Sequence, residues 1–216
     1  MAVEDVLEEV AAEVRVCTKC DLCKNTKNGV PGEGSPHAEV LFIGEAPGYH
    51  EDRQGRPFIG PAGQFLNELL GSVGLDRSTV FITNVVKHRP PENRDPLPDE
   101  IAACSDYLTR QIAALNPKVI VTLGRFSMAR FFPGAKISAI HGQAKKVDGR
   151  VVVAMYHPAA ALHQQSLRQT VVDDFKRSIP PALAEARRME AAGALGDKPK
   201  KKDDNEDEPP KQLSLF

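Results

Sequence analysis

Four short apolar runs along the chain predict the strands of a sheet. They span residues 40–43, 80–82, 119–123 and 151–155. Continuous apolar runs of this length are typical of strands buried on both faces, as in a parallel sheet covered by helices on either side. We therefore expect a central, mainly parallel four-stranded sheet.

Amphipathic stretches lie before and between these runs and predict helices. Apolar residues recur at helical spacing over residues 2–16, and further helix candidates span 63–75, 98–115 and 125–132. Because strands and helices alternate, the pattern indicates an α/β fold in three layers, α/β/α, with the sheet in the middle.

The pattern stops near Arg188. Residues 197–211 contain five Lys, six Asp or Glu and no aliphatic or aromatic side chain. Such a segment cannot bury a core, so we expect a disordered charged linker there. The chain then ends in a short apolar cluster, residues 212–216.

Length and charge narrow the class of protein. The 216 residues suit one domain plus a tail, and 41% of them are hydrophobic, which is ordinary for a globular protein. The formal net charge of -1 indicates no nucleic-acid partner by itself, so any basic face must be local. No apolar run suits a signal peptide or a membrane span. We expect a cytoplasmic monomer with no membrane partner.

Four cysteines stand out in a chain expected in a reducing compartment. Cys17, Cys20 and Cys23 form a C-x₂-C-x₂-C run, and Cys104 lies on a predicted helix. In such a compartment this usage favours metal or cluster binding over disulfides. The four thiols could hold an iron–sulfur cluster or zinc unaided.

Polar, turn-forming segments follow three of the four predicted strands. They begin at Gly44, at Thr83 and at Tyr156, whereas only Gly124 and Arg125 follow the remaining strand. Ligands bind beyond the carboxyl ends of strands in open α/β sheets, so these segments predict a site there. The turn over residues 44–48 has two Gly around a Pro, which leaves backbone N–H groups open to a planar ligand.

Taken together, these segments resemble the uracil-DNA glycosylase superfamily, and most of all its iron–sulfur type, family 4. The matching segments are residues 44–48, 51–52, 55–60, 83–87, 89–91 and 157–158. The resemblance runs from about Val6 to about Ile179. It implies a DNA-repair glycosylase, associated with the nucleoid, that flips uracil out of DNA and hydrolyses its N-glycosidic bond to leave an abasic site.

The resemblance implies how the base is held. Phe58 would stack on uracil, and the Asn84 amide would pair with its O4 and N3–H, two roles that cytosine reverses. Glu51 would lie beside C5 and exclude the methyl group of thymine. The implied substrate-binding residues are Gly44, Glu45, Ala46, Glu51, Phe58, Asn84 and His157.

The resemblance also implies the catalytic groups. His157 would donate a hydrogen bond to uracil O2, where negative charge grows as the bond breaks. Other branches place an Asp where Ala46 stands, to orient the water. Here either the DNA phosphates and His157 suffice or Glu45 helps, so His157 and Glu45 are the catalytic candidates. Leu162 is the expected DNA wedge, next to His163 where the family more often has Arg.

For the cofactor, the family pattern implies a [4Fe-4S] cluster on Cys17, Cys20, His88 and Cys104, with His88 where the family usually has Cys. Histidine ligates iron in some clusters. Cys23 is the rival to His88 as fourth ligand, and zinc is the alternative to the cluster. The cluster would be structural, since hydrolysis requires no electron transfer.

The chain end resembles the peptide by which bacterial proteins dock onto the replicative sliding clamp. Gln212, Leu213, Leu215 and Phe216 match that motif. A flexible linker would give such a peptide its reach. We thus expect a glycosylase domain with its cluster over residues 1–190, the linker over 191–211 and the clamp-binding peptide over 212–216.

Two alternatives stay open. One is a covalent uracil-DNA-binding protein of the same superfamily, although the loop over residues 89–98 lacks the basic, His-bearing insertion of that branch. The other is an iron–sulfur electron-transfer protein, which would not need Phe58, Asn84 and His157 at strand ends. Release of free uracil, against a denaturation-resistant adduct, separates the enzyme from the covalent binder.

Overall fold

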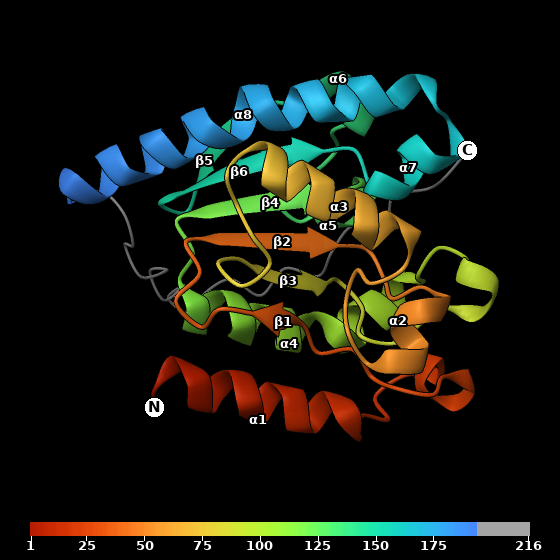
Figure 1. The fold of residues 1–216 in the computed structure, drawn as a ribbon. Coiled ribbons are helices and arrows are strands. Elements are labelled where there is room, and N and C mark those ends of the chain that lie inside the picture. Colours follow the sequence, from red (N-terminus) through yellow and green to blue (C-terminus); the bar gives the residue numbers. More distant parts are fainter. Residues whose placement is uncertain (194–216) are drawn as a thin grey trace, which may run out of the picture.

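The computed structural model describes residues 1–193, so the terminal peptide 212–216 and most of the predicted linker lie outside the described residues. A six-stranded sheet in the order β1-β3-β2-β4-β6-β5 forms the centre of the fold (Figure 1). The strands are β1 (Glu33–Gly34), β2 (Val40–Gly44), β3 (Phe81–Asn84), β4 (Val119–Leu123), β5 (Ala144–Val147) and β6 (Arg150–Met155).

The four central strands β3, β2, β4 and β6 are parallel and confirm the predicted parallel sheet. The expected number of four strands was wrong, because β1 and β5 add antiparallel edges. Neither edge strand has an apolar run: β1 has two residues, and β5 reads Ala-Lys-Lys-Val with three of its four residues exposed. An edge strand of this kind leaves no hydrophobic signal in the sequence.

Helices cover both faces of the sheet and confirm the three-layer arrangement. The α-helices are α1 (Val3–Arg15), α2 (Tyr49–Gln54), α3 (Pro61–Ser72), α4 (Pro98–Leu115), α5 (Arg125–Ala129), α6 (Ile137–Ile140), α7 (Pro158–His163) and α8 (Ser166–Ala191). Two 3₁₀ turns, η1 (Asp21–Asn25) and η2 (Pro91–Asn93), lie in the connections. Helices α3 and α8 lie on one face and α1 and α4 on the other (Figure 1).

Each face of the sheet has its own hydrophobic cluster. On the α3–α8 side the ring of Phe42 stacks on that of Phe175 with centroids 6.2 Å apart. On the α1–α4 side Leu41 and Ile43 pack with Val10 and Leu108. Successive side chains of β2 thus point to opposite cores, which explains why the strand is apolar at every position.

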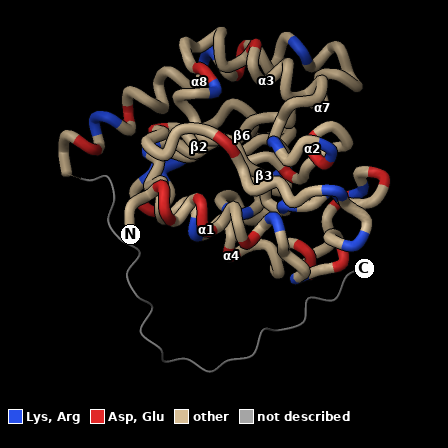
Figure 2. The backbone as a smooth tube through the Cα atoms, turned by 60° about the horizontal axis from the view of Figure 1, so that its bottom comes forward, with Lys and Arg blue, Asp and Glu red and all other residues tan. Residues whose placement is uncertain are grey.

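The parallel strands bring the predicted site segments to one edge. Gly44 and Asn84, the last residues of β2 and β3, are direct partners in the register, and β6 ends beside β4 at Met155. Acidic and basic residues are interspersed over the fold (Figure 2). Among the described residues, no helix has both the length and the apolar character that a membrane crossing requires.

Candidate active site

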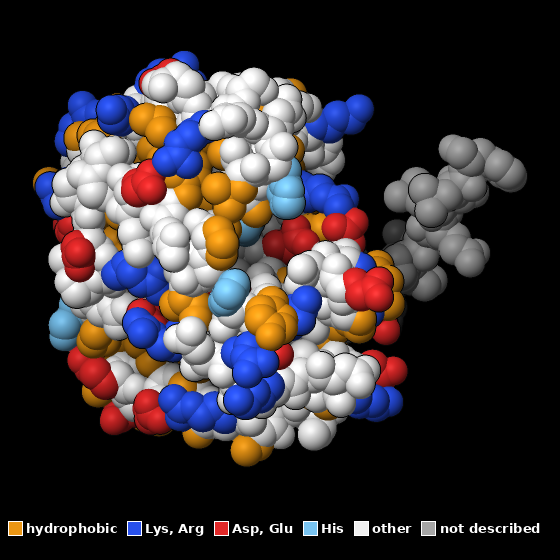
Figure 3. All heavy atoms as spheres, turned by 45° about the vertical axis from the view of Figure 1, so that its right-hand side comes forward, with side chains coloured by type: hydrophobic (Ala, Val, Ile, Leu, Met, Phe, Trp, Pro, Cys, Tyr) orange, Lys and Arg blue, Asp and Glu red, His pale blue; other side chains and the backbone are white. Residues whose placement is uncertain are grey.

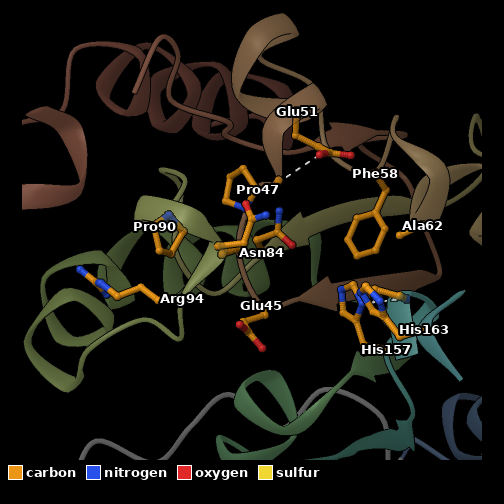
Figure 4. Close-up of a pocket in the computed structure, with 14 residues that line it drawn as sticks. Glu45, Pro47, Glu51, Phe58, Ala62, Asn84, Pro90, Arg94, His157 and His163 are labelled. Atoms are coloured by element: carbon orange, nitrogen blue, oxygen red, sulfur yellow. Dashed lines mark hydrogen bonds between the residues drawn. The ribbon is translucent and has the colours of Figure 1, made fainter. Parts of the chain in front are cut away.

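A pocket of about 400 Å³ opens at the carboxyl edge of the sheet, as Figures 3 and 4 show. It receives residues from the loops after β2, β3 and β6, the three strand ends that the sequence indicated. Its lining consists of Glu45, Ala46, Pro47, Gly48, Glu51, Phe58, Ala62, Asn84, Pro90, Asn93, Arg94, His157, Ala159 and His163.

Six of the seven residues predicted to bind the substrate line this pocket, and Gly44 lies directly behind two of them. A methyl group added at Gly44 would lie 2.3 Å from Asn84 Oδ1 and 2.6 Å from the ring of Phe58. Both distances are well below van der Waals contact. Glycine at this position therefore lets Asn84 and Phe58 lie where they do.

The side chain of Asn84 carries an unpaired acceptor. Asn84 is 1% exposed, and its Oδ1 atom is buried without a hydrogen-bond partner among the described residues. An unsatisfied buried acceptor costs about 1–3 kcal/mol. Asn84 lines the pocket, so a ligand that brings an N–H group to this oxygen would recover that cost (Figure 4).

A fully buried lysine, which the sequence analysis did not single out, holds the main chain at Asn84. Lys87 Nζ donates to the carbonyl of Asn84 over 3.0 Å, to Thr83 Oγ1 over 2.6 Å and to Gln111 Oε1 over 2.8 Å. Burial lowers the pKa of Lys87 to about 7, against the opposing charge of the nearby Cys104. The end of β3 is thus fastened to α4, which carries Gln111.

Phe58 forms one wall of the pocket in a strained backbone conformation. Its φ of 51° lies in the left-handed region, which a non-glycine residue adopts only when its surroundings hold it there. Arg77 holds it, with hydrogen bonds of 2.7 Å to the carbonyl of Pro57 and 2.9 Å to that of Phe58. The Phe58 ring lies 5.4 Å from that of His157, centroid to centroid.

Glu51 ties two loops of the pocket together. Its carboxylate accepts hydrogen bonds from the backbone N–H groups of Gly48 (3.1 Å), Ile59 (2.9 Å) and Gly60 (2.9 Å). The side chain lines the pocket between Pro47 and Phe58 (Figure 4). The placement against uracil C5 stays a prediction, while the loop-joining contacts were not expected from the sequence.

His157 is held as a neutral hydrogen-bond donor. It caps the N-terminus of α7, where its Nδ1 accepts from the backbone N–H of Ala159 over 3.1 Å. Burial lowers its pKa to about 4, and the charge of Glu51 opposes this shift. With Nδ1 used as an acceptor, the single ring proton is on Nε2.

Glu45 places a carboxylate in the same pocket (Figure 4). Burial is the largest cause of the raised pKa of Glu45; the charge of Asp95 adds to it and that of Arg125 opposes it. Asp95 and Arg125 form an ion pair of their own. A carboxylate with a raised pKa that lines the same pocket as a hydrogen-bond donor, His157, is suited to general base catalysis.

Three of the four cysteines gather on the α1–α4 side of the sheet. Cys104 is buried on α4, and Cys17 and Cys20 pack against the same hydrophobic cluster. Burial raises the pKa of Cys104 to about 11, and the neighbouring Cys17 and Cys20 raise it further, whereas Lys87 opposes. Lys87 also donates its backbone N–H to Cys104 Sγ over 3.2 Å.

The rival fourth ligands have different surroundings. Cys23 lies in η1 close enough to Cys20 to act on its pKa, whereas the charged neighbour of the buried His88 is Asp52. In the part of the chain that the structure describes, no three His, Cys, Asp or Glu converge on one metal ion. Cysteine thiolates are ligands of both iron–sulfur clusters and zinc, so the chemistry of this donor set fits either group.

Comparison with known proteins decides the family. The family model of the uracil DNA glycosylase superfamily matches residues 31–178. The chain belongs to the uracil-DNA glycosylase superfamily. The match confirms the resemblance and includes every strand that supplies the pocket.

Curated relatives within the superfamily carry the name type-4 uracil-DNA glycosylase. One from Sulfurisphaera tokodaii is 47% identical over 85% of this chain and 88% of its own length. One from Archaeoglobus fulgidus is 47% identical over 79% and 90%, and one from Thermotoga maritima is 42% identical over 81% and 94%.

Two further residues lie around the pocket of this superfamily member. Leu162, on α7, is 44% exposed and lies outside the pocket lining, to which Ala159 and His163 of the same segment belong; its role as a DNA wedge stays a prediction. Arg94 also lines the pocket, in a two-point ion pair with Glu100 at 2.6 and 2.9 Å. The ion pair with Glu100 orients the Arg94 side chain, and the sequence alone does not indicate this contact.

Proposed function

We propose that this protein is a uracil-DNA glycosylase that removes uracil from DNA as a step of base excision repair. The side chain of Asn84 carries the proposal, because its Oδ1 has no hydrogen-bond partner among the described residues and an N–H group of a base in the pocket would supply one. The names of the relatives agree with this activity. Uracil inside a duplex is inaccessible, so the nucleotide must first flip out at a cost of a few kcal/mol.

Recognition follows from the chemistry of one amide. Uracil N3–H donates to Asn84 Oδ1, and the Asn84 amide nitrogen donates to uracil O4. Cytosine presents an acceptor at N3 and a donor at N4, so it leaves both groups unpaired. The ring of Phe58 offers a stacking surface, and base–aromatic stacking contributes about 1–3 kcal/mol per base. Glu51, by its place in the lining, would exclude the methyl group of thymine.

Bond cleavage rests on His157. As the bond between N1 and C1′ breaks, its electron pair passes into the uracil ring and negative charge collects on O2. The proton on His157 Nε2, fixed there by the Ala159 contact, stabilises that charge as a hydrogen-bond donor. With a pKa of about 4, the His157 ring is uncharged at neutral pH and acts as a hydrogen-bond donor through Nε2–H.

A water molecule completes the hydrolysis. It attacks C1′ of the oxocarbenium-like sugar, and the Glu45 carboxylate accepts its proton, which leaves an abasic sugar and the uracil anion. The raised pKa of Glu45 supports this assignment, since it makes the carboxylate a stronger base. Ala46 offers no carboxylate, so Glu45 is the acidic residue of the first loop that reaches the pocket along with Glu51.

We further propose a [4Fe-4S] cluster on Cys17, Cys20 and Cys104, with His88 or Cys23 as the fourth ligand. The cluster would supply a covalent cross-link between the N-terminal segment and α4. The gathering of three thiols supports this proposal. Iron and sulfide analysis tests it, and the fourth ligand is the one of His88→Ala and Cys23→Ala that lowers the iron content.

The terminal peptide is proposed to tether the enzyme to the sliding clamp and so to replicated DNA. The motif over residues 212–216 supports this, and it lies outside the described residues. Deletion of these five residues should abolish binding to purified clamp while excision from a short oligonucleotide is retained. Undiminished clamp binding by the truncated chain would contradict the tether.

The experiment for the main proposal uses a labelled oligonucleotide with a single uracil, beside thymine and cytosine controls. Alkali converts abasic sites to strand breaks. Multiple turnovers at uracil alone would support the glycosylase. A DNA adduct that survives denaturation would instead identify the covalent binding protein, and an intact oligonucleotide would contradict both.

A further inference from the structure

Tyr49, Arg53 and Arg89 form a group beside the pocket that we call the Tyr49 clamp. Tyr49 is the first residue of α2 and 49% exposed. Its neighbour Gly48 and the neighbour of Arg89, Pro90, both line the pocket. The clamp therefore lies at the mouth of the pocket, where Figure 3 shows hydrophobic and basic side chains next to one another beside the hollow.

The two arginines are held by one aromatic ring. The guanidinium carbon of Arg53 lies 5.5 Å from the centroid of the Tyr49 ring, and that of Arg89 lies 5.3 Å from it. Arg53 Nη1 also donates to the Tyr49 hydroxyl over 3.0 Å, and Arg89 Nε donates to Asn93 Oδ1 over 2.7 Å. These contacts fix both side chains and leave most of their N–H groups free.

Neither cation has a carboxylate partner in residues 1–193, although other arginines near the pocket do. Arg94 is paired with Glu100, for example. Asp52, the acid next to Arg53 in the sequence, is buried and accepts from the backbone N–H of Lys27 over 2.8 Å. Glu92, the acid nearest to Arg89 in the sequence, is exposed and forms no ion pair with Arg89. The two positive charges beside one ring repel each other, and an anion bound next to them would offset this repulsion.

We propose that the Tyr49 clamp binds one phosphodiester of the DNA strand that carries the flipped uridine. This inference rests on the proposed function. Guanidinium groups match the geometry of phosphate oxygens through paired N–H donors, and stacking on an aromatic ring orients them. A protein with a net charge of -1 needs such local cations to hold DNA. The clamp at the mouth fixes the strand backbone while the base enters the pocket.

Salt dependence of binding tests the clamp, because each phosphate contact on a single strand contributes about 0.7 to the slope of log Kd against log salt concentration. The probe is a single-stranded oligonucleotide with one abasic site, the reaction product. We expect the double variant Arg53→Gln/Arg89→Gln to lower the slope by about 0.7. Tyr49→Ala should lower it too, and Tyr49→Phe, which keeps the ring, should lower it less.

Lys176→Gln is the matched control, since it removes an exposed cation on α8 that is absent from the pocket lining. Its slope should equal that of the wild type. An unchanged slope in the double variant would overturn the clamp, provided that thermal unfolding shows it to be folded. The wild type is first assayed for release of uracil. If the wild type releases uracil but the double variant keeps the wild-type slope, the clamp alone is refuted. If the wild type releases no uracil, the proposed function is refuted and the clamp with it.

Discussion

The fully buried ammonium group of Lys87 donates a 3.0 Å hydrogen bond to the main-chain carbonyl of Asn84, the residue whose amide faces the pocket. The backbone N–H of the same lysine donates to Cys104 Sγ. One residue therefore joins the end of β3 to Cys104 on α4. The position of the amide that we propose to read the base therefore depends on contacts outside the pocket.

Replacement of Lys87 by Met should therefore impair both stability and excision. Met is similar in length but removes the three hydrogen bonds that Lys87 Nζ donates, including the one to the carbonyl of Asn84. A buried carbonyl left unpaired costs about 1–3 kcal/mol, whereas Thr83 Oγ1 and Gln111 Oε1 still hydrogen-bond to each other over 3.2 Å. Urea unfolding measures the loss. Lys145→Met, at an exposed position on β5, is the control and should unfold as the wild type does. Equal stability of the two variants would contradict the role of Lys87.

Gly44→Ala should slow excision by about 10²-fold, because the added methyl group displaces Asn84 and Phe58 and small displacements of positioning groups cost this much. Steady-state excision of uracil measures the effect. Gly71→Ala is the matched control, since a methyl group there meets nothing within 4 Å. It should keep full activity and stabilise α3 by up to about 1 kcal/mol. Equal activity in both variants would show that Gly44 is not needed for close packing.

Excision should fall as the pH drops through the raised pKa of Glu45. A general base acts only when deprotonated, and the raised pKa of Glu45 means that activity is lost at a higher pH than an unperturbed glutamate would give. His157, with a pKa of about 4, stays neutral over this interval and does not cause the fall. Glu45→Gln should lower the rate by about 10²–10⁴ and remove the acid limb of the pH–rate profile. An acid limb that persists in Glu45→Gln would exclude Glu45 as the base.

His157 should also make stability depend on pH. Its folded pKa of about 4 lies below the ordinary value of about 6.5, so between these pH values the unfolded chain binds a proton that the folded protein does not. Stability is therefore lost as the pH falls from about 6.5 to 4. His157→Gln should lose less over this interval in urea titrations, whereas His37→Gln, at an exposed position, should behave as the wild type. Parallel curves for all three proteins would contradict the burial of a neutral His157.

Periodicity predicted the parts of the fold that bury apolar surface. The four central strands and α1 and α4 appear at or within one or two residues of the expected positions. Helix α8 was not predicted, because Pro180 and Pro181 interrupt its pattern and its stability comes from packing on β4 and β6. The edge strands β1 and β5 have no hydrophobic signal at all.

The parts of the site that lie directly after parallel strands could be predicted from the sequence. The parts that depend on contacts between residues far apart in the sequence could not. Parallel strands alone bring Gly44 and Asn84 together. The hydrogen bond from Arg77 to the carbonyl of Phe58 joins residues 19 positions apart, and no local sequence pattern indicates it. The burial of Lys87 is equally hidden, since lysine is ordinarily a surface residue.

The central claim is that Asn84 reads uracil, and the most direct test compares release of free uracil and free cytosine by the wild type and by Asn84→Asp. The wild type should release uracil over many turnovers and no cytosine. Aspartate lacks the N–H donor for uracil O4, so Asn84→Asp should release uracil about 10²–10⁴-fold more slowly. Its preference should shift toward cytosine, because the N4 amino group of cytosine can donate a hydrogen bond to the carboxylate. Wild-type rates for uracil in Asn84→Asp, or release of cytosine by the wild type, would contradict the account.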